Sequence, residues 1–178
     1  MSLPTALITG STLGIGRATA RAFAGAGYRV VLNGPERDDD ATESEREIQA
    51  LSPSSGLVVA DLATVAGARG LVAAALERFG RIDALVLNAG ICPMAELEDV
   101  DDALWDTVHA VNLRGAFFTA QGIARHMIDA GRGGAIVGVS SVSARLGSPR
   151  QLHYSPTKAG MTSIVQGLAV ALGPHGIR

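Results

Sequence analysis

The stretch Ala6-Leu7-Ile8-Thr9-Gly10-Ser11-Thr12-Leu13-Gly14-Ile15-Gly16 decides the fold of this chain. A short apolar strand runs here into a glycine-rich turn, and an amphipathic helix follows. Glycines at 10, 14 and 16 allow φ values and a close backbone approach that a Cβ would block. The helix N-terminus offers free N–H groups and its positive dipole end to a pyrophosphate. The spacing G-x-x-x-G-x-G differs from the commoner G-x-G-x-x-G, so a plain glycine turn remains an alternative.

Strand-like and helix-like segments alternate along the rest of the chain. We predict strands at residues 5–9, 29–32, 57–60, 84–87 and 135–139, and helices at residues 14–26, 38–51, 65–79, 103–130 and 154–172. Short, nearly all-apolar strands between helices indicate a parallel sheet that is covered on both faces. Right-handed crossovers then give a doubly wound α/β fold, a Rossmann-type three-layer α/β/α arrangement. With no repeat and no linker, residues 1–178 form a single dinucleotide-binding and catalytic domain.

The composition excludes several classes of function. Apolar residues make up 47% of the 178 residues and charged residues 18%, which is typical of a globular domain. A net charge of −2, without a basic cluster, argues against a nucleic-acid or membrane-surface binder. Cys92 is the only cysteine, so an intrachain disulfide and a thiolate metal cluster are excluded, and we predict no metal. No apolar run is long enough for a membrane span, and we predict a cytoplasmic protein.

Polar residues follow three of the later strands. Asp61 stands where it could accept from an adenine amino group or cap the next helix. Asn88 opens Asn88-Ala89-Gly90, where its amide could brace the neighbouring strand or sit in a simple turn. Ser140 and Ser141 end the last strand, and a hydroxyl there can polarise a carbonyl oxygen. Because the carboxyl ends of parallel strands meet at one edge, we expect these residues to converge with the glycine turn.

Tyr154 and Lys158 lie four positions apart, on one face of a helix that begins near Tyr154. Pro156 fits because the first turn of a helix tolerates proline. A tyrosine acts as a base near neutrality only if its pKa is lowered, and a nearby ammonium and an oxidised nicotinamide could do this. A surface Tyr–Lys pair is the alternative. His153 lacks an evident partner and is interpreted as a pocket wall or surface residue.

These motifs, in this order, resemble the short-chain dehydrogenase/reductase family over essentially the whole chain. The resemblance implies that Tyr154 is the acid/base, that Ser141 holds the substrate oxygen, and that Lys158 lowers the pKa of the tyrosine and binds the nicotinamide ribose. It also implies that Asn112 holds a water in a proton relay. We predict that the cofactor contacts the following residues: Gly10, Thr12, Gly14, Ile15, Gly16, Asn33, Asp61, Leu62, Asn88, Ala89, Gly90, Tyr154 and Lys158.

The chain departs from the family pattern in two places. Leu87 replaces the first of two asparagines that often precede Ala-Gly, which is a mild change. Family members also continue past Gly176-Ile177-Arg178 into a sixth strand, a substrate loop and a seventh strand. We therefore expect a chain truncated at its C-terminus, with an exposed sheet edge and unburied apolar area next to the fifth strand.

The choice of cofactor is read at the end of the second strand. An acid there would bond the adenosine ribose and repel a 2′-phosphate, but Gly34 occupies the position. A base typical of NADP-preferring relatives is also missing, since Leu13 stands in its place. Arg37 could reach a 2′-phosphate or be solvated. We expect NAD or NADP, with a slight lean to NAD.

The substrate and the partners follow from further likenesses. The runs Ala89-Gly90-Ile91-Cys92-Pro93 and His153-Tyr154-Ser155-Pro156-Thr157-Lys158 resemble those of bacterial sugar 1-dehydrogenases, the L-rhamnose enzymes in particular. This implies oxidation of an anomeric hydroxyl to a lactone. The alternatives are a 3-oxoacyl-carrier-protein reductase and a non-catalytic, cofactor-binding remnant. The apolar helices at residues 103–130 and 154–172 build the dimer interface in the family, so we expect a homodimer or homotetramer.

Overall fold

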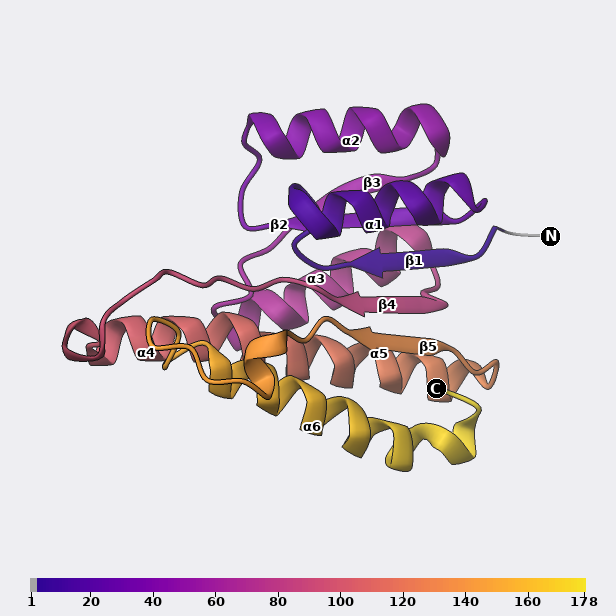
Figure 1. The fold of residues 1–178 in the computed structure, drawn as a ribbon. Helices are drawn as coiled ribbons and strands as arrows, with labels where there is room; N and C mark the ends of the chain where they lie inside the picture. The colour runs from indigo at the N-terminus through magenta and orange to yellow at the C-terminus, as the bar shows by residue number, and fades with distance from the viewer. Residues whose placement is uncertain (1–2) are drawn as a thin grey trace.

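The sheet has five parallel strands in the order β3-β2-β1-β4-β5 (Figure 1). The structure is a computed structural model that describes residues 3–178. Its strands are β1 Thr5–Ile8, β2 Arg29–Gly34, β3 Gly56–Val59, β4 Ala84–Leu87 and β5 Ala135–Gly138. The order reverses between β1 and β4, which opens a crevice at their carboxyl ends. The predicted doubly wound parallel sheet is confirmed.

Helices cover both faces of this sheet (Figure 1). They are α1 Gly14–Gly25, α2 Asp39–Leu51, α3 Val65–Phe79, α4 Asp102–His109, α5 Ala116–Ala130 and α6 Ser155–Leu172. The prediction of one α-helix over residues 103–130 is wrong, because a π-helical segment, Ala110–Gly115, joins α4 to α5. Hydrophobic spacing cannot distinguish the two hydrogen-bond patterns within one continuous helix. Such π segments often lie at functional sites.

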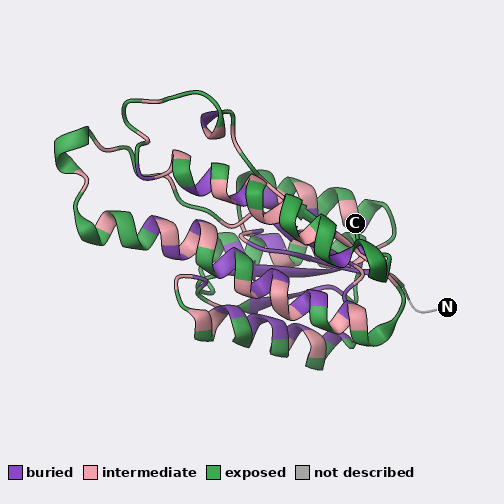
Figure 2. Ribbon diagram, turned by 90° about the horizontal axis from the view of Figure 1, so that it is seen from below, coloured by how far each residue is buried: buried purple, intermediate pink, exposed green. Residues whose placement is uncertain are grey.

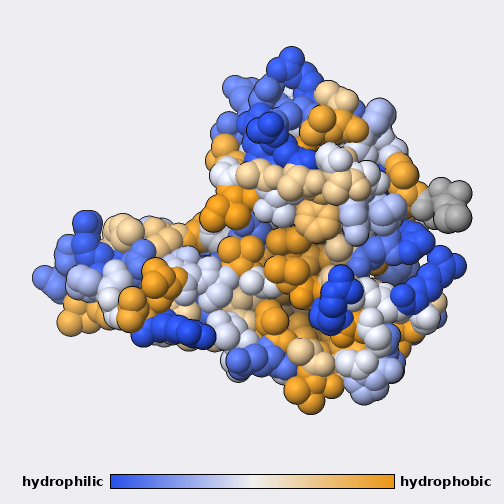
Figure 3. Space-filling view, turned by 45° about the vertical axis from the view of Figure 1, so that its right-hand side comes forward, coloured by the Kyte–Doolittle hydropathy of each residue, from blue (hydrophilic) through white to orange (hydrophobic). Residues whose placement is uncertain are grey.

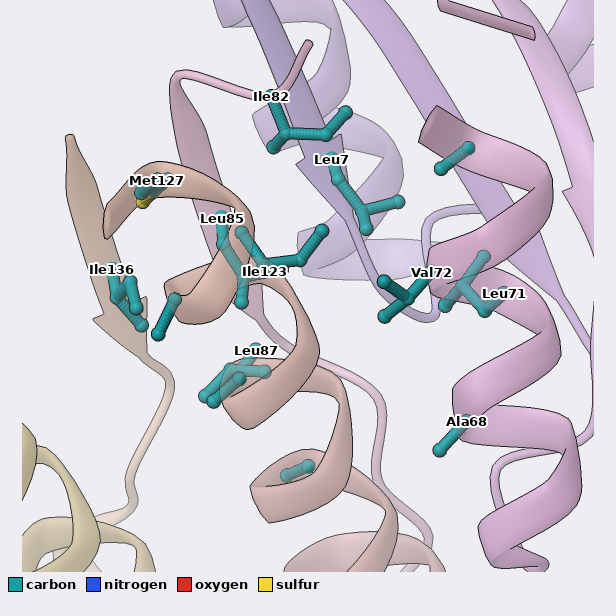
Figure 4. Close-up of a cluster of buried hydrophobic side chains, with 14 of the residues drawn as sticks. Leu7, Ala68, Leu71, Val72, Ile82, Leu85, Leu87, Ile123, Met127 and Ile136 are labelled. Atoms are coloured by element: carbon teal, nitrogen blue, oxygen red, sulfur yellow. The ribbon is translucent and has the colours of Figure 1, made fainter. Parts of the chain in front are cut away.

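The core lies in two layers, one on each face of the sheet. Successive side chains of a strand point to opposite faces, so Ala6 and Ile8 pack with α1 and α2. Leu7 points the other way and joins Leu71 of α3 and Ile123 of α5 (Figure 4). Figure 2 shows that buried residues form stripes along the helices and fill the strands. Both layers hold the strands rigidly, which fixes where their carboxyl ends lie.

β3 and β5 are the two edge strands of the sheet, and apolar side chains are exposed beside β5. Val137 of β5 and Val170 of α6 are both exposed, and Figure 3 shows a broad apolar area on the lower part of the face it presents. Ile177 forms an isolated parallel bridge with Gly134 next to β5. None of the helices in residues 3–178 combines the length and apolar character needed to cross a bilayer.

Candidate active site

A cavity of about 620 Å³ opens at the carboxyl ends of the strands. This volume is in the range of small-molecule and cofactor sites. Its walls include every predicted site residue except Thr12 and Asn112. The full lining is Gly10, Leu13, Gly14, Ile15, Gly16, Asn33, Pro35, Ala60, Asp61, Leu62, Asn88, Ala89, Gly90, Ile91, Cys92, Val111, Val139, Ser140, Ser141, Tyr154 and Lys158.

The glycine turn forms one end of this cavity. Gly10 has φ +60°, and a Cβ there would lie 2.7 Å from the Cα of Ala89. Gly14 has φ +52° and opens onto free space. α1 begins here without a side-chain cap and without an acid in its first turn, whereas Asp38 caps α2 and Thr64 caps α3. The first N–H groups of α1 are therefore available to a pyrophosphate.

Asn88 braces the glycine turn from the neighbouring strand. Its Nδ2 donates to the carbonyls of Thr9 at 3.0 Å and Gly10 at 2.8 Å. The Thr9 hydroxyl in turn accepts from the backbone N–H groups of Asn88 and Ala89, both at 3.0 Å. The predicted local brace is confirmed, and a simple turn is excluded. These bonds hold β1 and β4 together at the point where the crevice opens.

The amide of Asn33 is engaged by backbone groups rather than free. Its Nδ2 donates to the carbonyls of Val58 at 3.3 Å and Ala60 at 3.1 Å, and its Oδ1 accepts from Gly10 N at 3.3 Å. Asn33 thus ties β2 to β3 and to the glycine turn, although one side of it lines the cavity. The neighbouring Gly34 packs on Thr12, whose Cγ2 would lie 2.7 Å from a Cβ at position 34. Thr12 does not line the cavity.

Asp61 is exposed on the cavity wall and does not cap α3. Its Oδ1 accepts from Ala63 N at 2.9 Å, which closes a local turn. Thr64 caps α3 instead, by accepting from Gly67 N. The interpretation of Asp61 as the helix cap is therefore wrong, because the loop after β3 is three residues longer than that role requires. The second carboxylate oxygen of Asp61 stays available to a ligand in the cavity.

Ser141, Tyr154 and Lys158 meet at the other end of the cavity. The Ser141 hydroxyl accepts from Ser143 N at 3.2 Å and Ser143 Oγ at 2.8 Å, and it shares a hydrogen bond with the Tyr154 phenol. The Lys158 ammonium donates to the Val139 carbonyl at 2.9 Å and lies 5.6 Å from the centroid of the Tyr154 ring. A surface Tyr–Lys pair is excluded, since Lys158 is buried.

Burial raises the pKa of the Tyr154 phenol above its usual value. The hydrogen bond with Ser141 opposes this rise, and the neighbouring Cys92 adds to it. Burial also lowers the pKa of Lys158. The lowering of the tyrosine pKa that the family resemblance assigns to Lys158 stays a prediction.

Asn112 lies behind the cavity, in the π-helical segment. Its Oδ1 accepts from Ile91 N at 2.8 Å, and its Nδ2 donates to Ile91 O at 2.9 Å and Thr157 Oγ1 at 3.2 Å. The fully buried amide therefore fixes the loop after β4 to α6. The role of Asn112 in a proton relay stays a prediction.

Sequence reasoning left out several residues of the cavity wall. Pro35, Ala60, Val111 and Val139 are apolar and carry no chemical signal of their own. Only their position at the ends of elements could have indicated them. Cys92 and Ser140 have chemistry, and both adjoin motifs that had been recognised.

This fold and cavity define a dinucleotide-dependent oxidoreductase. The glycine turn, which can bind a pyrophosphate, lines the same cavity as Ser141, Tyr154 and Lys158, which can transfer protons. Residues 4–178 match the profile of the short chain dehydrogenase family. The chain belongs to this family of NAD(P)-dependent dehydrogenases and reductases.

Relatives of known function are similar along most of the chain. An L-rhamnose 1-dehydrogenase (NAD(P)(+)) of Azotobacter vinelandii is 47% identical over 98% of this chain and 69% of its own length. A second enzyme of that name, from Sphingomonas sp., is 44% identical over 98% of this chain and 68% of its own length. Both are sugar dehydrogenases, and the comparisons do not favour a carrier-protein reductase.

Solved structures agree with the fold. A putative short-chain alcohol dehydrogenase from Sinorhizobium meliloti superposes with a TM-score of 0.94 at 36% identity, covering 100% of this chain and 70% of that protein. A metagenomic short-chain oxidoreductase in complex with NADP gives a TM-score of 0.91 at 31% identity, covering 98% of this chain and 79% of that one.

Proposed function

We propose that this protein oxidises the anomeric hydroxyl of an aldose, L-rhamnose being the first choice, to a lactone with NAD or NADP. The observation that carries the proposal is the meeting of Ser141, Tyr154 and Lys158 in the cavity that ends at the glycine cradle. A phenol, a hydroxyl and an ammonium that line one cavity suit proton transfer to and from a substrate oxygen. The likeness to sugar dehydrogenases supports the choice of substrate.

Each residue has one role in this proposal. Ser141 binds the substrate oxygen beside Tyr154, and the hydrogen bonds that its hydroxyl accepts from Ser143 hold it in place. Tyr154 takes the hydroxyl proton as the carbonyl of the lactone forms, and Lys158 holds the positive charge beside it. The nicotinamide supplies the hydride acceptor when bound. The N–H groups of Gly14 to Gly16 would hold the pyrophosphate of the cofactor, and Asp61 would hold its adenine.

We infer that the protein accepts both NAD and NADP. Asn33 is not free to bind the adenosine ribose, because its amide is hydrogen-bonded to backbone carbonyls, and Gly34 has no side chain to bind it. Arg37 does not reach freely for a 2′-phosphate, since its Nη1 donates to Glu45 Oε2 at 2.7 Å. With neither an acid nor a free base at the end of β2, little discriminates between the two cofactors. The slight preference for NAD that we expected from the sequence is therefore not supported.

Turnover assays test the proposal. We expect NAD(P)⁺ reduction with L-rhamnose, and a loss of kcat on the order of 10³-fold in Tyr154→Phe, which removes the proton acceptor. Tyr28→Phe is the matched control, because Tyr28 packs against Phe23 on α1, away from the cavity. Turnover of a 3-oxoacyl carrier protein but of no aldose would contradict the substrate. Cofactor binding without turnover on either panel would indicate a remnant.

We further propose that the protein forms a dimer or tetramer through α4, α5 and α6. A groove of about 430 Å³ lies between these helices, with Leu113, Phe117 and Ile164 in its walls. Trp105 is exposed beside it and stacks on His109 at 4.3 Å between ring centroids. Exposed aromatic side chains around an apolar groove are typical of an interface.

A further inference from the structure

We propose that His153 is a positioning residue of the active site: its imidazole holds the loop after β4 against the segment that presents Tyr154. The loop, residues 89–96, carries Cys92 and the substrate side of the cavity. The inference rests on the proposed function in one respect, since it assigns the effect to substrate rather than to cofactor.

The loop is mostly exposed and has few anchors. Asn112 fixes its start, through both backbone groups of Ile91. At its far end Ala95 N donates to Arg150 O at 3.3 Å, and Glu96 pairs with Arg150 at 3.0 Å, both on the surface. Between these points the Pro93 carbonyl accepts from His153 Nε2 at 2.8 Å. His153 is therefore the buried anchor in the middle of the loop.

The interpretation of His153 as a pocket-wall or surface residue is wrong, because the side chain neither lines the cavity nor reaches the surface. Its side chain is fully buried, with 0% exposure. Because a carbonyl oxygen only accepts, Nε2 must carry the proton in this tautomer. Nδ1 then has no partner among residues 3–178. The bond to Pro93 is therefore the hydrogen bond that the buried ring makes with the described residues.

The position of His153 couples the loop to catalysis. His153 directly precedes Tyr154, which lines the same cavity as Cys92. In the same segment, Gln151 Nε2 donates to Cys92 Sγ at 3.4 Å. Gln151 and His153 therefore bind two successive loop residues, Cys92 and Pro93. If the substrate binds between the phenol and the loop, His153 controls the distance between these two walls. A displacement of about 1 Å at such a gap can cost a large factor in rate.

Three variants separate the hydrogen bond from the volume of the side chain. His153→Leu and His153→Met keep an apolar side chain of similar size but cannot donate. His153→Gln restores a donor near the position of Nε2. His175→Leu is the matched control, because His175 is exposed in the turn after α6. Circular dichroism and a melting curve first establish which variants fold.

We expect the Leu and Met variants to raise the KM for L-rhamnose by about 10-fold, while the Kd of NAD⁺ changes by less than about twofold. The Gln variant and His175→Leu should stay within about twofold of the unaltered protein. An unchanged KM in the Leu and Met variants overturns the proposal. So does a parallel loss of NAD⁺ affinity without rescue by Gln, since that pattern reports general destabilisation.

Hydrogen exchange decides the matter independently of the substrate. In the Leu and Met variants the amides of Ile91 and Ala95 should exchange about 10-fold faster, while those of Asn88 and Ala89 keep their protection. Unchanged exchange at Ile91 and Ala95 overturns the inference whatever the assays give. If the unaltered protein does not oxidise L-rhamnose, the proposed substrate fails, and the exchange data still test His153.

Discussion

At the scale of the residue, the Tyr154 phenol makes the pH dependence of the reaction predictable. Burial raises its pKa and the hydrogen bond with Ser141 lowers it. Oxidation needs the deprotonated phenol, so kcat/KM for oxidation should rise with pH above neutrality, and that for reduction should fall. Ser141→Ala removes the opposing hydrogen bond, so the pKa rises further and the oxidative limb moves to higher pH. The control Ser54→Ala, at an exposed position, should leave the pH profile unchanged. If Ser141→Ala did not shift the pH profile either, the hydrogen bond from Ser141 would not control the pKa of Tyr154.

The contact between Thr12 and Gly34 makes a second prediction at this scale. An aspartate at position 34 would repel a 2′-phosphate, but its Cβ would collide with the Thr12 methyl at 2.7 Å. Thr12→Ser removes that methyl and keeps the hydroxyl. We expect the double variant Thr12→Ser/Gly34→Asp to lower kcat/KM for NADP⁺ relative to NAD⁺ by at least about 10-fold. Thr12→Ser alone is the control, and an equal loss for both cofactors would exclude the electrostatic reason.

At the scale of the element, Glu45 joins α2 to β3. Its Oε1 accepts from Leu57 N at 2.8 Å, and its Oε2 accepts from Arg37. Burial alone would raise the pKa of Glu45, but these hydrogen bonds and the charges of Arg37 and Arg78 together lower it. A lowered folded-state pKa contributes stability above the unfolded pKa, and that stability is lost as the pH falls through the folded value.

Glu45→Gln should therefore reduce the free energy of unfolding by about 1–2 kcal/mol at pH 7, with a smaller difference from the unaltered protein in acid. Urea unfolding at several pH values measures both effects. Glu77→Gln, at an exposed position of α3, is the control. A difference between the two proteins that does not shrink in acid would mean that the carboxylate charge is not responsible.

The elements themselves show what a sequence can predict. Strands and helices can be predicted from the spacing of apolar residues, because each element buries one face. This prediction needs no information on tertiary contacts. The π segment at Ala110–Gly115 does not, because it changes the hydrogen-bond partners and leaves the apolar spacing almost intact. The alternative that Asp61 caps α3 is wrong for a related reason: Thr64 can also cap that helix, and only the path of the loop after β3 decides between them.

At the scale of the whole molecule, the sheet explains why the candidate site was predictable. Parallel strands put every loop that follows a strand at one edge, so motifs far apart in sequence must converge there. Gly10, Asn88, Ser141 and Tyr154 therefore share one cavity, as their positions after successive strands indicated. His153 could not be assigned in this way, because its partner is a backbone carbonyl sixty positions earlier, which leaves no mark on the sequence.

Self-association is the remaining prediction at this scale. Phe117 is exposed on the wall of the groove between α5 and α6, where a second copy would bury it. We expect the protein to sediment as a dimer or tetramer at about 10 µM, and Phe117→Glu to weaken association on the order of 30-fold or more, as loss of a central aromatic contact does. Leu51→Glu places the same charge on an exposed apolar position of α2, and it should not change the oligomer. A monomeric unaltered protein, or equal effects of both variants, would show that this groove is not the interface, because Phe117 lies in its walls and Leu51 does not.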